Sequence, residues 1–136
     1  MRSDPKREAE RWLSQAEMEW SDACFLKESG RFYLALFLAQ QSAEKALKAF
    51  LFFHNEEPIF THSVSELLSL AQSVNTEFAI LKNARRLDDY YIPTRYPNGL
   101  PGDVPYLHYD DLEQVEKALE LCESVLNLVK KHIMHS

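Results

Sequence analysis

The fold is decided by residues 32–54, which read FYLALFLAQQSAEKALKAFLFFH. Residues 32–39 are apolar on every face of a helix, which is typical of a helix buried in the middle of a bundle. Polar side chains return farther along on one stripe only: Gln41, Glu44, Lys45 and Lys48. A row of small residues would let a neighbouring helix approach closely: Ala35, Ala39, Ala43 and Ala46. We therefore predict a central helix from about residue 32 to residue 54.

Capping signals predict further helices on both sides of this segment. A first helix is expected from about Pro5 to Ser29, with Asp4 as its N-cap and Gly30 just past its end. Ser63 and Glu66 have the spacing of a capping box, which predicts a short helix to about residue 73. A fourth segment, capped by Asn75 or Thr76, is expected to reach about residue 90. Its inward side is expected to carry Phe78, Leu81, Ala84 or Arg85, and Leu87 or Asp88.

The last helix is predicted to begin at a second capping box, formed by Asp110 and Glu113. It carries an apolar stripe with three- and four-residue spacing: Leu112, Val115, Leu119, Cys122, Leu126, Val129 and Ile133. A second apolar row lies beside that stripe: Leu121, Val125 and Leu128. This helix has more apolar surface than one neighbour covers, so we expect either a dimer face or a central position within the monomer.

Breakers of regular structure gather before the last helix. Four of the six prolines lie between residues 93 and 105, together with Gly99 and Gly102. Proline fixes φ and lacks a backbone donor, so we expect this stretch to be a loop without helix. No run of alternating β-branched residues predicts a strand. The chain is therefore predicted to be all-α: one domain, residues 1–136, forming an up-and-down bundle of about five helices, three long and two short.

Composition excludes several classes of function. Fifteen basic residues against 21 acidic ones give a net charge of −6, which excludes a generally basic coat on nucleic acid. The apolar stretches are far shorter than the roughly 20 residues of a membrane span, so we expect no membrane insertion. The first eight residues hold no apolar segment of a secretory signal, and the two cysteines have no disulfide or metal pattern. A cytoplasmic protein is expected.

Familiar catalytic and cofactor patterns are missing from the sequence. Three glycines cannot form a phosphate-binding glycine loop, and no serine lies in a nucleophile elbow. His132 and His135 are three residues apart, but they lie in the final turn, where fraying is expected. We therefore predict no cofactor and no metal site, and no catalytic residue can be named.

The most informative segment for function is residues 88–101, DDYYIPTRYPNGLP. Arg95 lies in a rigid stretch with Tyr91 and Tyr96, and a guanidinium held beside tyrosine rings can grip a phosphate while a base stacks. The alternative is that Arg95 pairs with Asp88 or Asp89 and that the tyrosines close the end of the bundle.

Two further groups are candidates to join Arg95 in an anion site. One is the polar stripe of the central helix, Gln41, Lys45 and Lys48, whose alternative role is a solvated face with a Glu44–Lys48 pair. The other is His62, which precedes the Ser63 cap and either makes a local hydrogen bond or contacts an anion at the N-terminus of the short helix.

Three strings of the sequence resemble one family. Residues 39–49, AQQSAEKALKA, are similar to the signature helix of HEPN domains (higher eukaryotes and prokaryotes nucleotide-binding). Residues 61–63, THS, followed by ELL at 66–68, resemble the same family. Residues 88–97, DDYYIPTRYP, are similar to the segment that ends in Arg-Tyr-Pro in its prokaryotic stand-alone branch. The resemblance runs from about residue 11 to the last helix in the right order.

This resemblance implies an all-α bundle that forms homodimers and binds a nucleotide or RNA. Many relatives are encoded beside a minimal nucleotidyltransferase as a toxin–antitoxin-like pair, so such a partner is expected. Some relatives are metal-independent ribonucleases with an arginine followed, after four to six residues, by a histidine. No arginine of this chain has that histidine, and twelve residues separate Arg95 from His108. Nucleotide or RNA binding is therefore the first hypothesis; the alternatives are a ribonuclease toxin and a module that only binds a protein.

Overall fold

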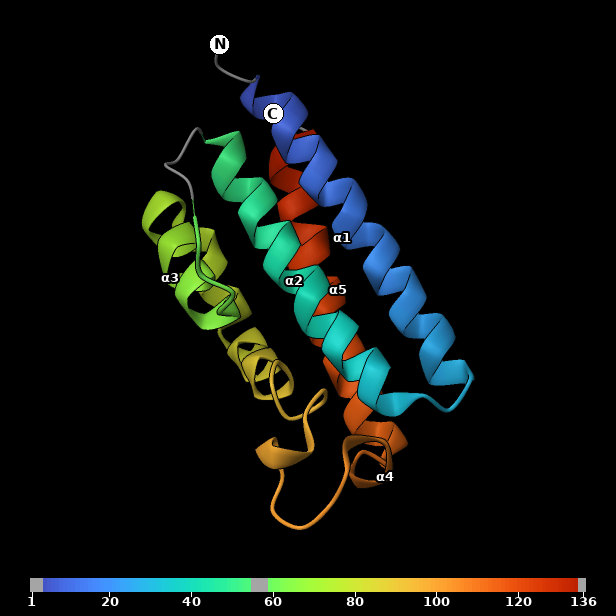
Figure 1. The fold of residues 1–136 in the computed structure, drawn as a ribbon. Coiled ribbons are helices and arrows are strands. Elements are labelled where there is room, and N and C mark those ends of the chain that lie inside the picture. The colour runs from blue at the N-terminus through green and yellow to red at the C-terminus, as the bar shows by residue number, and fades with distance from the viewer. Residues whose placement is uncertain (1–3, 55–58, 135–136) are drawn as a thin grey trace.

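The computed structural model describes residues 4–54 and 59–134. These residues form an all-α bundle, and none of them lies in a strand. Three long helices, α1 (Pro5–Glu28), α2 (Phe32–Phe53) and α5 (Leu112–Met134), run the length of the molecule (Figure 1). The shorter α3 (Val64–Val74) and the 3-10 helix η1 (Thr76–Tyr90) cover the side of α2 away from α1. The predicted fold class is confirmed.

Helix α2 is the centre of the bundle, as its apolar sequence predicts. It packs against α1, α3, η1, α5 and the short α4 (Pro105–His108). The predicted row of small residues is fully buried: Ala35, Ala39, Ala43 and Ala46. The close approach to α1 is marked by the hydroxyl of Ser42, which donates to the carbonyl of Ala16 at 2.6 Å. Burial of α2 on nearly all sides leaves only one stripe for its polar side chains.

The fourth predicted segment is a 3-10 helix rather than an α-helix. Asn75 caps it, because its side-chain oxygen accepts from the backbone N–H of Glu77 at 2.9 Å. The buried residues of η1 are spaced by three: Phe78, Leu81, Ala84 and Leu87. Side chains at i and i+3 eclipse in a 3-10 helix, which has three residues per turn, so this spacing places all four on one line against the core.

The expectation that residues 93–105 contain no helix is wrong in two places. A 3-10 turn, η2, spans Pro97–Gly99, and α4 spans Pro105–His108. In both cases proline is the first residue, where its missing N–H would have no partner within the helix anyway. Gly99 lets η2 fold back on the preceding loop, since a Cβ at this position would lie 3.1 Å from the Cα of Pro93.

One expectation for the last helix is corrected. Asp111, not Asp110, supports the first turn of α5, because its carboxylate accepts from the N–H of Glu113 at 3.0 Å. In the second apolar row, Val125 is fully buried and Leu128 is 7% exposed, whereas Leu121 is only half-buried. The central position in the monomer accounts for Val125 and Leu128, and a dimer face stays a prediction.

The N-terminus of α3 is tied to η1 by one carboxylate. Asp88 accepts from the N–H groups of Val64 at 2.7 Å and Ser65 at 2.9 Å, and from the hydroxyl of Ser63 at 2.8 Å. Ser63 also caps α3 as predicted, through the N–H of Glu66 at 3.1 Å. The reciprocal half of the capping box is taken by Thr61, whose hydroxyl accepts from the N–H of Ser63.

Replacing this carboxylate is expected to destabilise the fold. Asp88→Ala leaves the two backbone donors of α3 without their charged acceptor and should lower the free energy of unfolding by about 1–3 kcal/mol. The measurement is urea denaturation followed by circular dichroism. Asp89→Ala is the matched control, because Asp89 is exposed. Equal loss of stability in the two variants would contradict the role given to Asp88.

A second tie joins the C-terminal turns of α5 to the start of η1. Glu77 accepts from Lys131 Nζ at 2.7 Å and lies 2.9 Å from His132 Nε2. The hydrogen bond from Lys131, and then that from His132, lowers the pKa of Glu77. Because the folded pKa lies below the unfolded one, this contribution to stability is present above the unfolded pKa and is lost as pH falls through the folded pKa.

Glu77→Gln should therefore lower the melting temperature at neutral pH, and the difference from the parent protein should shrink as pH falls below about 4. Thermal melts between pH 3 and pH 7 measure this. Glu120→Gln, on the exposed side of α5, provides the control and should show little difference at any pH. A Glu77→Gln deficit that is the same at both ends of the range would show that the ion pair is not its source.

Candidate functional site

Arg95 is held in a tight turn at the end of η1. Its Nε donates to the carbonyl of Tyr91 at 2.8 Å, and its backbone N–H donates to the carbonyl of Ile92 at 3.0 Å. Thr94, which is buried, closes the same turn by donating from its hydroxyl to the carbonyl of Tyr90. One turn thus fixes the Nε end of the guanidinium against the backbone of Tyr91.

Three aromatic rings surround the guanidinium of Arg95. Its Cζ lies 4.6 Å from the ring centres of both Phe37 and Tyr91 and 5.2 Å from that of Tyr96. Such cation–π contacts contribute about 0.5–1 kcal/mol at exposed sites. Phe37 was expected only as an apolar residue of α2, although it lies one turn before Gln41 on the same stripe. That spacing is the signal that could have placed it in the site.

No carboxylate within residues 4–54 and 59–134 forms an ion pair with Arg95. Asp88 is engaged instead by the N-terminus of α3. The alternative in which Arg95 pairs with Asp88 or Asp89 is therefore wrong. Within the described residues, the hydrogen bond of the guanidinium is the one from Nε to the carbonyl of Tyr91.

His62 lies next to this cluster, on the connection before α3. Its ring is stacked on Tyr91 with centres 5.7 Å apart and an angle of 18°. Its Nδ1 is 3.3 Å from Glu44 Oε1, and its backbone carbonyl accepts from Gln40 Nε2 at 2.9 Å. The imidazole is 58% exposed. His62 and Tyr91 help to line a hollow of about 300 Å³ at the N-terminus of α3.

Glu44 is the buried centre of the polar stripe on α2. Its carboxylate is 3.1 Å from Lys48 Nζ, accepts from Gln41 Nε2 at 3.4 Å and contacts His62. The side chains of Glu44 and Lys48 are only 4% and 5% exposed. The predicted pair of Glu44 and Lys48 is present, but it is buried rather than solvated. Lys48 thus neutralises Glu44, and Glu44 in turn orients the imidazole.

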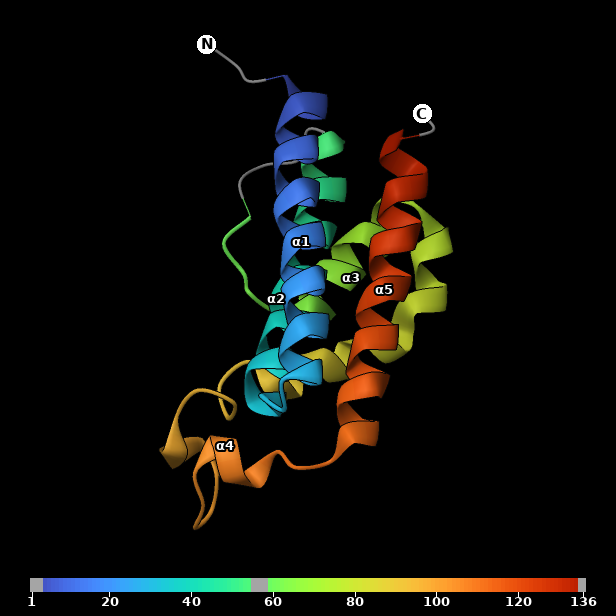
Figure 2. The same ribbon diagram turned by 90° about the vertical axis from the view of Figure 1, so that its right-hand side faces the viewer.

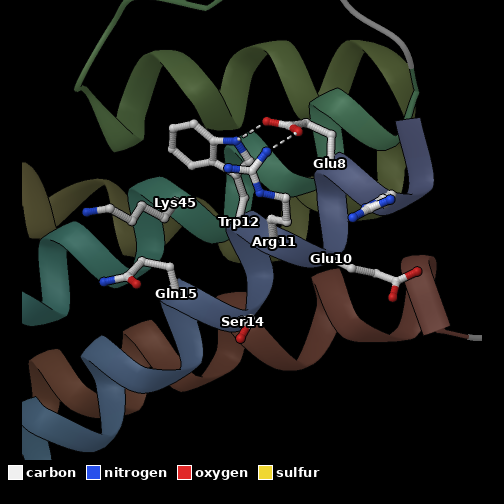
Figure 3. Close-up of a pocket in the computed structure, with 8 residues that line it drawn as sticks. Glu8, Glu10, Arg11, Trp12, Ser14, Gln15 and Lys45 are labelled. Atoms are coloured by element: carbon white, nitrogen blue, oxygen red, sulfur yellow. Dashed lines mark hydrogen bonds and ion pairs between the residues drawn. The ribbon is translucent and has the colours of Figure 1, made fainter. Parts of the chain in front are cut away.

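Lys45 lies at the other edge of the stripe, facing α1. Its Nζ donates to Glu19 Oε1 at 3.0 Å and to Gln41 Oε1 at 3.2 Å. Beyond it, a groove of about 740 Å³ follows α1, lined by Arg7, Arg11, Trp12, Gln15 and Lys45, among others (Figure 3). The indole N–H of Trp12 donates to Glu8 Oε1 at 3.1 Å, and Arg11 Nη1 lies 3.0 Å from Glu8 Oε2. Glu8 thus holds the indole and the guanidinium side by side.

The seven candidate residues are therefore linked to one another along one side of α2, with Lys48 buried. Contacts link Arg95 to Tyr91 and Tyr96, Tyr91 to His62, His62 through Glu44 to Gln41 and Lys48, and Gln41 to Lys45. Figure 1 shows this face of α2 between α1 and the connection that leads into α3. The structure does not bring Lys48 to the surface, because Lys48 lies beneath Trp12, 5.7 Å from its ring centre.

The described residues contain no cluster of three or more metal-ligating side chains. Within that part of the chain His132 is bound to Glu77, while His135 lies outside it. Burial raises the pKa of both thiols, that of Cys122 to about 12. None of the helices described is long and apolar enough to cross a membrane.

These features define an all-α bundle whose central helix carries a buried ion pair beside an arginine held among aromatic rings. The family model of the HEPN domain matches residues 9–132, so the chain belongs to the HEPN domain family.

Two solved structures support this assignment. The crystal structure of TT1696 from Thermus thermophilus is 35% identical, with a TM-score of 0.82 over 91% of this chain and 97% of that one. The structure of ST0689, an archaeal HEPN homologue, is 34% identical, with a TM-score of 0.76 over 93% of this chain and 98% of that one. No curated protein matches the chain.

Breaking the buried pair on α2 is expected to be costly. Glu44→Ala leaves the ammonium of Lys48 buried without its carboxylate and should lower the free energy of unfolding by about 3–5 kcal/mol. Replacing both residues, Glu44→Leu with Lys48→Met, removes both charges together and should recover most of that loss. Denaturant unfolding of the three proteins measures the difference. A double variant less stable than Glu44→Ala would contradict the pairing.

Proposed function

We propose that this HEPN protein binds a nucleotide or RNA, gripping a phosphate with Arg95. The observation that carries the proposal is a guanidinium enclosed by three aromatic rings and unpaired with any carboxylate of the described chain. A bare guanidinium held in position is suited to bidentate contact with phosphate oxygens. Because Nε is already bonded to the carbonyl oxygen of Tyr91, only the outer edge with the terminal nitrogens is left for a ligand.

The rings around Arg95 supply the second part of nucleotide recognition. Tyr96 is 49% exposed, so part of its surface is available for contact with a base. Stacking of a base on an aromatic ring contributes about 1–3 kcal/mol and does not depend on base identity. His62 offers a donor or acceptor next to Tyr91. This combination supports binding of a phosphate together with a base, in a chain whose net charge of −6 disfavours nonspecific binding elsewhere.

A ribonuclease is the second candidate function, and the placement of His62 favours it. RNA cleavage without a metal needs a base at the 2′-hydroxyl and a cation at the phosphate. Glu44 holds Nδ1 of His62, which leaves Nε2 with no partner in the described chain. The imidazole and the guanidinium of Arg95 contact the same ring, Tyr91, although they are far apart in sequence. His108 does not take this place, since its ring packs on Tyr109.

We further propose that the protein acts in the cytoplasm as a homodimer, paired with a minimal nucleotidyltransferase in a toxin–antitoxin-like system. The family assignment supports this proposal together with a surface suited to a partner. Four large apolar side chains are exposed around the loop between η1 and α5: Ile92, Tyr96, Tyr106 and Leu107. In the alternative, in which the chain only binds a protein, the partner would contact this surface and Arg95 would have no ligand. Co-purification with the nucleotidyltransferase tests the pairing.

The role of Arg95 is tested by titration with AMP and with a short RNA at fixed salt. Arg95→Ala should weaken binding by tenfold or more, about 1.4 kcal/mol, because a charge-assisted bidentate contact is lost. Arg95→Lys should recover only part of it, since an ammonium lacks the planar fork. Arg86→Ala, which removes an exposed arginine of η1, is the control. Binding unchanged in Arg95→Ala would overturn the proposal.

Incubation of the purified protein with labelled RNA and a chelator separates the two candidate functions. Cleavage that disappears in both Arg95→Ala and His62→Ala would establish the ribonuclease. Binding without cleavage would leave the nucleotide- or RNA-binding protein.

A further inference from the structure

We infer that the ligand is a single-stranded nucleic acid several nucleotides long, which runs from Arg95 along the polar stripe of α2 into the groove beside α1. This inference rests on the proposed function and specifies its substrate class. A mononucleotide would occupy only the end at Arg95.

The first step is the continuity of the surface between the two ends. Phe37, Gln41 and Lys45 follow one another at four-residue spacing, so they form one row along α2. Arg95 lies over the first of them, and Lys45 belongs both to this row and to the lining of the groove. Gln41 joins the two ends through its hydrogen bonds to Lys45 and Glu44.

The second step is the chemistry of the groove. Arg7, Arg11 and Lys45 supply three cations, and Trp12 supplies a ring whose N–H is fixed by Glu8. Figure 3 shows Trp12, Arg11 and Glu8 together on one side of α1, whereas Glu10 points away from Lys45 and Trp12. Cations interleaved with an aromatic ring are the pattern that tracks a phosphate backbone and stacks its bases. The cluster at Arg95 repeats this pattern at the other end.

The third step is length. Phe37 and Lys45 are two turns apart on α2, about 12 Å, and α1 adds about 12 Å between Gln15 and Arg7. Helices α1 and α2 run in opposite directions, so the two stretches continue one another instead of overlapping (Figures 1 and 2). A stacked strand advances about 3.4 Å per nucleotide, so the whole surface accommodates about seven nucleotides.

The fourth step is the charge balance of the groove without a ligand. Lys45 is paired with Glu19, and Arg11 with Glu8, whereas Arg7 has no carboxylate partner in the described chain. Glu8 and Glu10 both line the groove, and with Glu19 they offset its three cations. Binding along it is therefore expected to be weak and strongly dependent on salt. Removing the carboxylate of Glu19 should free Lys45 and tighten binding of the strand. Removing a cation should have the opposite effect and weaken that binding.

The experiment compares AMP with fluorescein-labelled oligoadenylate of about eight nucleotides, by anisotropy and competition at several salt concentrations. The parent protein should bind the oligomer roughly tenfold tighter than AMP. The triple variant Arg7→Gln, Arg11→Gln, Lys45→Gln should remove most of this advantage and reduce the salt slope by about 2, while AMP binding still depends on Arg95. Glu19→Gln should tighten the oligomer alone.

The control replaces three exposed cations of η1 and α5 and so removes the same charge: Lys82→Gln, Arg86→Gln and Lys117→Gln. The extended surface is overturned if the oligomer binds no tighter than AMP, or if the triple variant binds the oligomer as well as the parent protein does. Neither result overturns the phosphate contact at Arg95. If Arg95→Ala weakens the binding of neither AMP nor the oligomer, the proposed function itself is overturned. Parallel titrations with oligo-dA and oligo-rA then identify which type of strand is preferred.

Discussion

The structure depends on the burial of α2 on every side but one. A helix so enclosed has a single stripe for polar groups, and the carboxylate of Glu44 on that stripe must be neutralised where it lies. Lys48, one turn later, supplies the charge, and the pair is almost fully buried. The remaining oxygen of Glu44 then contacts His62 and Gln41. The constraint that stabilises the core therefore also organises the surface that faces a ligand.

This arrangement explains why residues from distant parts of the sequence meet. The connection before α3 is anchored to α2 through Gln40 and Glu44, and the end of η1 is anchored to α3 through Asp88. Those two anchors bring His62 and Tyr91 together. Arg95 follows Tyr91 by one turn and contacts Phe37 of α2. The candidate site is thus assembled on the rigid central helix, although most of its exposed groups come from connections.

Much of the fold could be predicted because each element carries its own signal. The apolar start of α2, the cap at Ser63 and the cap at Asn75 are local features, and all three are confirmed. The 3-10 character of η1 was also present in the sequence, in the three-residue spacing of Phe78, Leu81, Ala84 and Leu87, but the same residues fit an α-helix nearly as well. The short helical turns at Pro97 and Pro105 span only three and four residues, too few to show an apolar periodicity, so the prolines between residues 93 and 105 indicated only a loop. Assignment to the Arg-Tyr-Pro branch of the family stays a prediction.

By itself, the sequence determined the all-α class, the central position of α2 and the residue types of an anion site, because periodicity and capping act over a few residues. Only the tertiary structure decided which charges are available. Lys48 and Arg95 look alike as cations in the sequence. Packing buries Lys48 against Glu44 and takes Asp88 to the N-terminus of α3. Arg95 is then left without a carboxylate partner among residues 4–54 and 59–134. The physical reason is that the pairing of a charge depends on its distance to partners on other elements, and chain topology sets that distance.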